Sequence, residues 1–216
     1  MTVLKWILVL VVSYLLGCIQ TGVIISGAQH VDIRAHGSKS TGTTNVFRVL
    51  GAKASLVTFV GDVLKGVLAC LLGLWLLGNT GASLAGIAVV LGHMYPVFYK
   101  FKGGKGVATS LGTSLVLNPL LGLILLAVSA VGIAITHVVS IFSIVSLVAF
   151  GLINPFLCKG DVAEIIYSIV LALLVVWAHR TNIKRLLSGT ENKLDFSRKK
   201  TKRNLCSTVR IASASR

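Results

Sequence analysis

The chain has 216 residues, of which 55% are hydrophobic and only 12% are charged, and its mean hydropathy is +0.88. Soluble domains average about half apolar and about a quarter charged residues, so this composition excludes an ordinary soluble fold. The net charge of +15 would indicate a nucleic-acid partner in a soluble protein, but in a membrane protein it indicates basic loops beside anionic lipid, and we expect no nucleic-acid binding.

The first apolar segment runs from about residue 4 to residue 26 and is long enough to cross a bilayer. The first twenty residues could also form a signal peptide, because LLGC faintly resembles a lipoprotein cleavage site. The apolar run continues past that point through Ile25, which favours a retained transmembrane helix.

The next segment, residues 29–54, is polar and basic and contains RAHGSKSTGTTNVFR at 34–48. Short polar side chains, glycines that permit close backbone approach and a planar guanidinium are suited to binding phosphate. An ordinary loop with helix caps would have a similar composition, so this segment alone leaves both interpretations open. Its candidate site residues are Gly37, Ser38, Gly42, Thr43, Thr44, Asn45 and Arg48.

Two further apolar segments, 55–77 and 81–98, follow the first loop. Asp62 and Lys65 lie three positions apart and therefore share one helical face. Ionisable groups at membrane depth are costly, so the two residues form either a structural ion pair or the support of a site.

The stretch FKGGKGVATSLG, residues 101–112, places lysines and glycines directly before an apolar helix. We expect the glycines to expose backbone N–H groups, and the helix that begins near Val107 to point its positive end at the same spot. This pattern predicts an anion site at the membrane surface, although lysines that merely snorkel to the interface are the alternative. The residues of this predicted site are Lys102, Gly103, Gly104, Lys105 and Gly106.

The apolar segment 106–136 is longer than one span needs and is interrupted by Asn118-Pro119. Proline removes a backbone donor and disfavours helix at the preceding residue, so we expect short helices around 106–117 and 119–136. The remaining apolar segments are 138–157 and 162–178.

Lysine and arginine are concentrated in the segments 29–54 and 99–105 and after residue 178. The positive-inside rule places all three on the cytoplasmic side, which requires an odd number of crossings and an outside N-terminus. We therefore predict an all-α integral membrane protein with seven transmembrane helices, a cytoplasmic C-terminus, a catalytic domain over residues 1–197 and a basic, disordered tail over 198–216.

The last basic segment carries His179, Asn182 and Arg185 at helical spacing, which either face the other loops or belong to an amphipathic surface helix. Ser140 and Ser143 either cap the helix at 138–157 or point into the same hollow. The four cysteines are scattered, so they indicate neither a zinc site nor a disulfide framework, and we expect no metal or cofactor. We see no internal repeat, which disfavours an inverted-repeat transporter.

Three of these segments together resemble the bacterial acyl-phosphate-dependent glycerol-3-phosphate acyltransferases. The family pattern G-S-G-N-x-G-[AT]-T-N-x-x-R is similar to Gly37–Arg48, and G-H-x-x-P-x-F-x-x-F-K-G-G-K-G-V-A-T matches residues 92–109. The pattern H-x-x-N-I-x-R-L-x-x-G-x-E matches His179–Glu191, and the resemblance extends to about residue 195. Lys39 and Ser40 stand where the family has Gly-Asn, and Gln20 stands where proline is common.

The resemblance implies transfer of a fatty acyl group from acyl phosphate to the 1-hydroxyl of sn-glycerol 3-phosphate, giving lysophosphatidic acid and phosphate. It implies a monomer in the bacterial inner (plasma) membrane, in contact with membrane lipids and with its site facing the cytoplasm. The residues implied to hold the reacting groups are Ser38, Arg48, Lys105, Ser143 and His179. The resemblance implies that Asn45, Asn182 and Arg185 support them. Asp62, Lys65 and His93 are further candidates for a supporting role.

A mixed anhydride is already activated, so such an enzyme mainly has to position two phosphorylated substrates and neutralise charge. Whether His179 acts as a base or only as a phosphate ligand stays open. A transporter or channel for phosphorylated metabolites, and a lipid-binding scaffold held by its tail, are the alternative functions.

Overall fold

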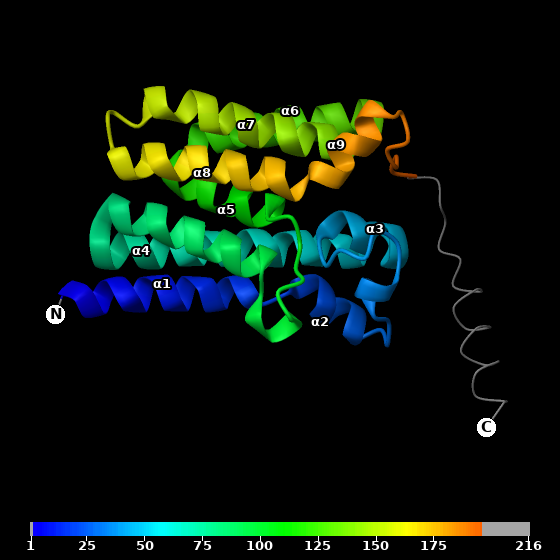
Figure 1. The fold of residues 1–216 in the computed structure, drawn as a ribbon, viewed down its shortest axis with the longest axis horizontal. Coiled ribbons are helices and arrows are strands. Elements are labelled where there is room, and N and C mark those ends of the chain that lie inside the picture. The colour runs from blue at the N-terminus through cyan, green and yellow to red at the C-terminus, as the bar shows by residue number, and fades with distance from the viewer. Residues whose placement is uncertain (1, 196–216) are drawn as a thin grey trace.

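The computed structural model describes residues 2–195, which form an elongated bundle of helices (Figure 1). This part of the chain contains no strand, as predicted for an all-α protein. The α-helices are α1 (Thr2–Cys18), α2 (Thr21–Gly27), α3 (Thr43–Leu50), α4 (Ala52–Met94), α5 (Val107–Leu117), α6 (Pro119–Thr136), α7 (Val139–Leu157), α8 (Val162–Ala178) and α9 (Arg180–Leu187). Two short 3-10 helices, η1 (Ile33–Ala35) and η2 (Val97–Tyr99), precede α3 and follow α4.

Within residues 2–195, four stretches are long and apolar enough to cross a membrane: Thr2–Gly27, Ala52–Tyr99, Pro119–Thr136 and Val139–Leu157. A fifth is obtained when α8 and α9, which are bent by 59° relative to one another, are counted as one span. Large apolar side chains are exposed on these helices, among them Trp75, Leu120 and Phe156. Such extensive apolar exposure is expected where lipid surrounds the bundle, so the chain is a multi-pass membrane protein.

Helix α4 contains a reversal, so its 43 residues run along the bundle twice. Gly78 has a φ of 68° and a ψ of −159°, outside the helical region, and only glycine adopts that backbone readily. The Cys70 thiol donates a hydrogen bond to the Ala82 carbonyl oxygen across the two arms. The predicted segments 55–77 and 81–98 are thus two antiparallel arms, although the second arm ends at Met94, earlier than predicted.

The first apolar segment is interrupted between α1 and α2, which the sequence analysis did not predict. Gln20 lies buried at the break, where its amide nitrogen donates to the His93 carbonyl oxygen at 3.1 Å. Its amide oxygen accepts from the Thr41 hydroxyl at 2.6 Å. The break is therefore held by contacts with distant residues, and no proline marks it in the sequence.

The predicted division of the segment 106–136 is confirmed, because α5 ends at Leu117 and α6 begins at Pro119. Asn118 caps α6 by accepting a hydrogen bond from the Leu121 backbone N–H at 3.2 Å. A capping asparagine followed by proline at the first helical position is a strong start signal for a helix.

Glycines allow α1 and α5 to lie directly against the two arms of α4. A Cβ atom at Gly92 would lie 2.1 Å from the Tyr14 carbonyl oxygen of α1. A Cβ at Gly112 of α5 would lie 2.1 Å from the Val63 carbonyl oxygen of the first arm. Small residues permit such close backbone contact in membrane bundles, and here they hold α5 against the first arm of α4 near Val63.

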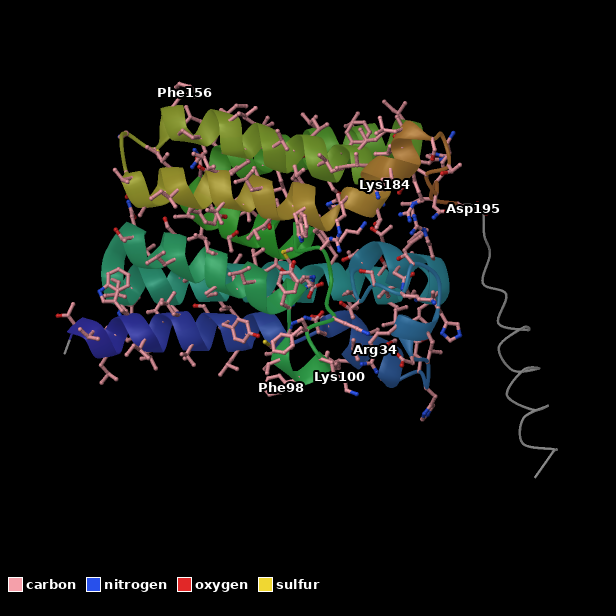
Figure 2. All side chains as sticks on the ribbon, viewed as in Figure 1. Arg34, Phe98, Lys100, Phe156, Lys184 and Asp195 are labelled. Carbon is pink, nitrogen blue, oxygen red and sulfur yellow. The ribbon has the colours of Figure 1, made fainter. Side chains whose placement is uncertain are left out.

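The beginning of α1 and Asp195 lie at opposite ends of the bundle (Figures 1 and 2). Helices α3 and α9 gather at the end marked by Asp195, whereas Phe156 marks the other end (Figure 2). The predicted tail, residues 198–216, lies outside the described residues.

Candidate active site

A cavity of about 390 Å³ lies among α3, α4, α5, α6 and α7, and α9 and residues 191–194 contribute to its wall. All three predicted phosphate-binding segments reach it. Its polar wall includes Ser38, Gly42, Thr43, Thr44, Asn45, Arg48, Asp62, His93, Lys105, Gly106, Ser140, Ser143, His179, Asn182, Arg185 and Glu191. Its apolar wall includes Val107, Leu111, Leu125, Leu126, Ile133, Leu147 and Phe150.

The first loop is organised around the buried amide of Asn45. The amide nitrogen donates to the carbonyl oxygens of Ile33, His36 and Ser40 at 2.8–3.1 Å, and the amide oxygen accepts from the Ser38 N–H at 2.8 Å. Both ends of the amide are therefore occupied. Asn45 therefore shapes the loop from its position in the cavity wall.

Gly37 belongs to the same arrangement and does not line the cavity. Its φ is 58°, and a Cβ atom there would lie 2.2 Å from the Asn45 side-chain oxygen. Gly37 therefore lets the loop wrap around Asn45 at close range.

Helix α3 presents Thr43 and Arg48 to the cavity with unused hydrogen-bonding groups. The Arg48 Nη2 donates to the Asn192 carbonyl oxygen at 3.2 Å, but its buried Nε has no partner among residues 2–195. The Thr43 hydroxyl is likewise buried without a partner in the described part of the chain. Buried polar groups are nearly always hydrogen-bonded in native proteins, so these atoms indicate a polar ligand or ordered water.

The glycines before α5 have a different role from the predicted one. The Gly103 N–H donates to the Met94 carbonyl oxygen at 3.2 Å, and the Gly104 N–H donates to the His93 carbonyl oxygen at 3.1 Å. These two N–H groups are therefore not available to an anion. A Cβ at Gly104 would lie 2.1 Å from the His93 Nε2, so the glycine is required for close packing against that ring.

Gly106 keeps its predicted place at the cavity wall, where it has a φ of 81° and forms the N-cap of α5. Val107 and Ala108 of the first turn of α5 line the cavity as well. The first turn of a helix has N–H groups without intrahelical partners, so the expected anion-favouring helix end lies at the cavity.

The Lys105 ammonium donates a hydrogen bond to the Asn182 side-chain oxygen, which joins the second segment to the third. Burial lowers the pKa of Lys105 to about 8, and the charges of Arg185 and Arg48 lower it as well. The nearby Glu191 carboxylate opposes this lowering, so the three cations lie close together at one end of the cavity with one carboxylate among them. In contrast, Lys102 is exposed and does not line the cavity, so its predicted contact with substrate is not supported.

His179 lies at the bend between α8 and α9 and is buried. Its Nδ1 is 2.8 Å from the Val175 carbonyl oxygen, which can only accept, so Nδ1 carries the proton and Nε2 is an acceptor. Burial lowers the pKa of His179 to about 4, and the Lys105 charge acts in the same direction. A neutral imidazole with this tautomer accepts a hydrogen bond and brings no positive charge to a phosphate.

Glu191 is the residue of this site that the sequence analysis passed over. Its carboxylate accepts hydrogen bonds from Ser140 at 3.1 Å, Asn182 at 2.7 Å and Arg185 at 2.9 Å. Burial raises the pKa of Glu191, but the hydrogen bonds outweigh this effect and leave the pKa below its ordinary value. Glu191 is the acidic residue that ends the third motif, and its place in that motif could have identified it as a site residue.

The serines at the start of α7 face the cavity. The N-cap of α7 is Val138, with no side-chain cap, so neither Ser140 nor Ser143 caps the helix. Ser140 is held by Glu191, and Ser143 is buried in the cavity wall.

Asp62 and Lys65 form a buried ion pair at 2.8 Å, and both interpretations drawn from the sequence apply to it. The Lys65 ammonium also lies 2.8 Å from the His93 Nδ1 and 2.7 Å from the Ile19 carbonyl oxygen. Asp62 and His93 line the cavity, whereas Lys65 is packed behind them. The pair is structural and at the same time supports the wall on which Gly104 rests.

The family profile described as Glycerol-3-phosphate acyltransferase matches residues 7–189. The chain belongs to this family. The glycerol-3-phosphate acyltransferase of Thermoanaerobacter sp. (strain X514) is 50% identical over 189 residues, covering 87% of this chain and 95% of the relative. That of Clostridioides difficile (strain 630) is 44% identical over 201 residues, covering 90% of this chain and 98% of the relative.

The fold is similar to crystal structures of PlsY (YgiH), an integral membrane glycerol 3-phosphate acyltransferase. The glycerol 3-phosphate form has a TM-score of 0.83 and 37% sequence identity, covering 88% of this chain and 96% of that one. The lysophosphatidic acid form has a TM-score of 0.81 and 36% identity, covering 88% of this chain and 95% of that one. The range matched by the family profile contains the cavity residues from Ser38 to Arg185, whereas Glu191 and Leu194 lie beyond its end.

Proposed function

We propose that this acyltransferase moves a fatty acyl group from acyl phosphate to the 1-hydroxyl of sn-glycerol 3-phosphate, giving lysophosphatidic acid and inorganic phosphate. The single observation that supports this most is a cavity with two chemically different ends. Arg48, Lys105 and Arg185 gather at one end, and apolar residues of α5, α6 and α7 line the rest. A substrate that carries both phosphate and a hydrocarbon chain fits this combination.

In this proposal the cationic end binds the phosphates of both substrates. The Arg48 Nε has no partner among residues 2–195, and the charges of Arg185 and Arg48 both lower the pKa of the neighbouring Lys105. Charge-assisted hydrogen bonds to phosphate are about twice as strong as neutral ones, so these cations would supply most of the binding. Ser38, Thr43, Thr44 and Ser143 would add neutral hydrogen bonds, and the first turn of α5 would face an anion.

The proposed reaction needs little covalent chemistry from the protein. The 1-hydroxyl oxygen bonds to the acyl carbon, and the bond from that carbon to the phosphate oxygen breaks. The hydroxyl proton passes to an oxygen of the departing phosphate, so lysophosphatidic acid and phosphate are the only products. The cations lower the barrier by stabilising the negative charge that develops at the carbonyl oxygen and the phosphate.

We assign His179 the task of orienting the glycerol hydroxyl. Its Nε2 is a hydrogen-bond acceptor because Nδ1–H is bound to Val175. Its lowered pKa, about 4, makes it a weak base near neutral pH, which favours the phosphate oxygen as the final proton acceptor.

We further propose a bacterial plasma-membrane protein with seven crossings, an outside N-terminus and a cytoplasmic site. The reversal within α4 and the division between α5 and α6 support this count, and the opposite placement of the two described ends supports an odd number. We also propose that the enzyme acts as a monomer.

The deciding experiment compares donors with purified protein in detergent, where no gradient exists. Acyl phosphate together with glycerol 3-phosphate is expected to give lysophosphatidic acid, whereas acyl-CoA is expected to give none. Turnover with acyl-CoA alone would overturn the proposed donor. Uptake of glycerol 3-phosphate into proteoliposomes without any product would instead favour the transporter, and loss of cellular activity on deletion of residues 198–216 would favour the scaffold.

A further inference from the structure

Away from the cations, the wall of the cavity extends as far as Ser114 of α5, Gly122 of α6 and Phe150 of α7. Asn118 lies four residues from both Ser114 and Gly122, and Asn154 lies four residues from Phe150. Four residues correspond to about one helical turn, so Asn118 and Asn154 form the next layer beyond the apolar end. Neither asparagine lines the cavity.

This next layer is a continuous hydrogen-bonded chain across the bundle. The Asn118 amide nitrogen donates to the Asn154 amide oxygen at 2.9 Å, and the Asn154 amide nitrogen donates to a Glu164 carboxyl oxygen at 3.0 Å. Asn154 is fully buried and Glu164 is nearly so. A hydrocarbon end that entered this layer would separate buried polar groups from their partners, which is costly in a low-dielectric interior.

Phe150 lies just inside this layer and is held rigidly. Only 1% of its surface is exposed, and its ring meets that of Tyr167 edge to face with the centroids 6.3 Å apart. The Tyr167 hydroxyl is in turn hydrogen-bonded to the Thr113 hydroxyl. The ring therefore cannot turn aside without disturbing a packed core.

Gly122 lies opposite and offers no side chain. A Cβ atom there would meet the flexible end of Leu115 at 3.2 Å, so alanine is accommodated with a small adjustment of that side chain. A methyl group at Gly122 would therefore lie against Ser114 and Leu115 of α5, at the place where α5 and α6 both line the cavity, and would fill space between these two helices.

We propose that Phe150 and Gly122, backed by the Asn118–Asn154–Glu164 chain, limit the length of the acyl group that the enzyme accepts. This inference rests on the proposed acyl-phosphate reaction. Ser140, at the polar end of the cavity, and Phe150 are separated by about 15 Å along α7 at 1.5 Å per residue. An acyl chain that exceeds the room beyond the reacting carbonyl meets the Phe150 ring and the polar layer behind it.

The experiment measures kcat/KM with lauroyl, myristoyl, palmitoyl and stearoyl phosphate for the wild type, Phe150→Ala and Gly122→Ala. Removing the ring is expected to raise the ratio of stearoyl to myristoyl turnover by about tenfold or more, because one methylene in an apolar pocket already changes kcat/KM by about that factor. Gly122→Ala is expected to lower the same ratio. Phe156→Ala is the matched control, since Phe156 lies on the same helix but is 87% exposed, at the end of the bundle labelled in Figure 2.

Each outcome decides the inference. Active variants with ratios within about threefold of the wild type would show that the chain leaves the cavity sideways, and this would overturn the length limit. An equal shift in Phe156→Ala would also overturn it, since loosening of α7 would then be the cause.

If Phe150→Ala fails to fold, Gly122→Ala and the milder Phe150→Leu carry the test. A wild type inactive with every acyl phosphate would overturn the proposed function and the limit together, whereas wild-type turnover with unchanged ratios overturns the limit alone.

Discussion

The Lys105 ammonium donates a hydrogen bond to the side-chain oxygen of Asn182, 77 positions further along the chain. This contact joins the glycine-rich segment before α5 to the short helix α9. The amide nitrogen of Asn182 also donates to Glu191. The single Asn182 amide therefore connects Lys105 with the Glu191 carboxylate. The contact places Lys105 at the same end of the cavity as His179. The positive charge of Lys105 accordingly helps to lower the pKa of His179.

Replacing Lys105 or Arg48 by alanine is expected to lower kcat/KM by about a hundredfold or more, because each variant loses a charge-assisted contact with phosphate. Lys100→Ala is the control, since Lys100 is exposed in the same loop and does not line the cavity. Lys102→Ala is expected to resemble this control. Turnover assays with purified variants check this, and a loss below about threefold in both site variants would remove these residues from the site.

The pH dependence of kcat/KM is expected to reflect Lys105. Burial lowers the pKa of its ammonium to about 8, so the free enzyme carries this charge below pH 8 and loses it above. Because the charged form binds phosphate, kcat/KM is expected to fall by about tenfold per pH unit above the pKa. Lys105→Arg keeps its charge in this range and should remove the alkaline fall, even if its overall activity is lower. An unchanged alkaline fall in this variant would assign the titration to another group.

Gly104→Ala is expected to damage activity through packing. The new Cβ atom would lie 2.1 Å from the His93 Nε2, and the Lys65 ammonium holds that ring from the other side. The segment carrying Lys105 must then shift, so we expect kcat/KM to fall by about tenfold or more. Gly27→Ala is the control, because a Cβ atom there meets nothing within 4 Å. Equal activity of the two variants would contradict the close packing.

Glu191→Ala is expected to lower both stability and activity. The substitution leaves the Ser140, Asn182 and Arg185 donors without their shared acceptor. Ser140 and Asn182 are buried, and an unsatisfied buried group costs about 1–3 kcal/mol, whereas the half-exposed Arg185 can turn to solvent. Glu191→Gln keeps an acceptor and should lose less. Thermal unfolding in detergent and kcat/KM measured together check this order, which would be wrong if alanine were tolerated better than glutamine.

The proposed topology is tested by labelling single cysteines in a background that lacks Cys18, Cys70, Cys158 and Cys206. Cysteines replacing Lys5 and Lys159 are expected to react with an impermeant reagent in intact cells. A cysteine replacing Lys193 is expected to react only after the membrane is opened. All three native lysines are exposed, so accessibility is not limited by burial. Reaction of Lys159→Cys and Lys193→Cys from the same side would contradict seven crossings.

Features of the fold that depend on local chemistry could be predicted from the sequence. Asn118-Pro119 divides α5 from α6 because a capping side chain and a missing N–H act on neighbouring residues. The break at Gln20 could not be predicted, since it depends on hydrogen bonds to His93 and Thr41, which are distant in the sequence.

For the candidate site, too, the residue types could be predicted from the sequence, whereas the hydrogen bonds of particular atoms could not. The motifs identified the cations and the hydroxyls that line the cavity, because charge and residue type are properties of the sequence. The uses of particular atoms were not visible there. The Gly103 and Gly104 N–H groups are consumed by the end of α4, the Asn45 amide by its own loop, and the role of Glu191 depends on which donors the fold brings to it.

The segment after α9 has a consequence for the order in which the protein matures. Glu191 is bonded to α7 and α9, Asn192 accepts from Arg48 of α3, and the Leu194 N–H donates to the His137 carbonyl oxygen at 2.7 Å. This segment emerges from the ribosome after every apolar helix has been made. The hydrogen bonds that Glu191 and Asn192 make with α3, α7 and α9 can therefore form only after all three helices have been synthesised, so this part of the cavity wall is completed late.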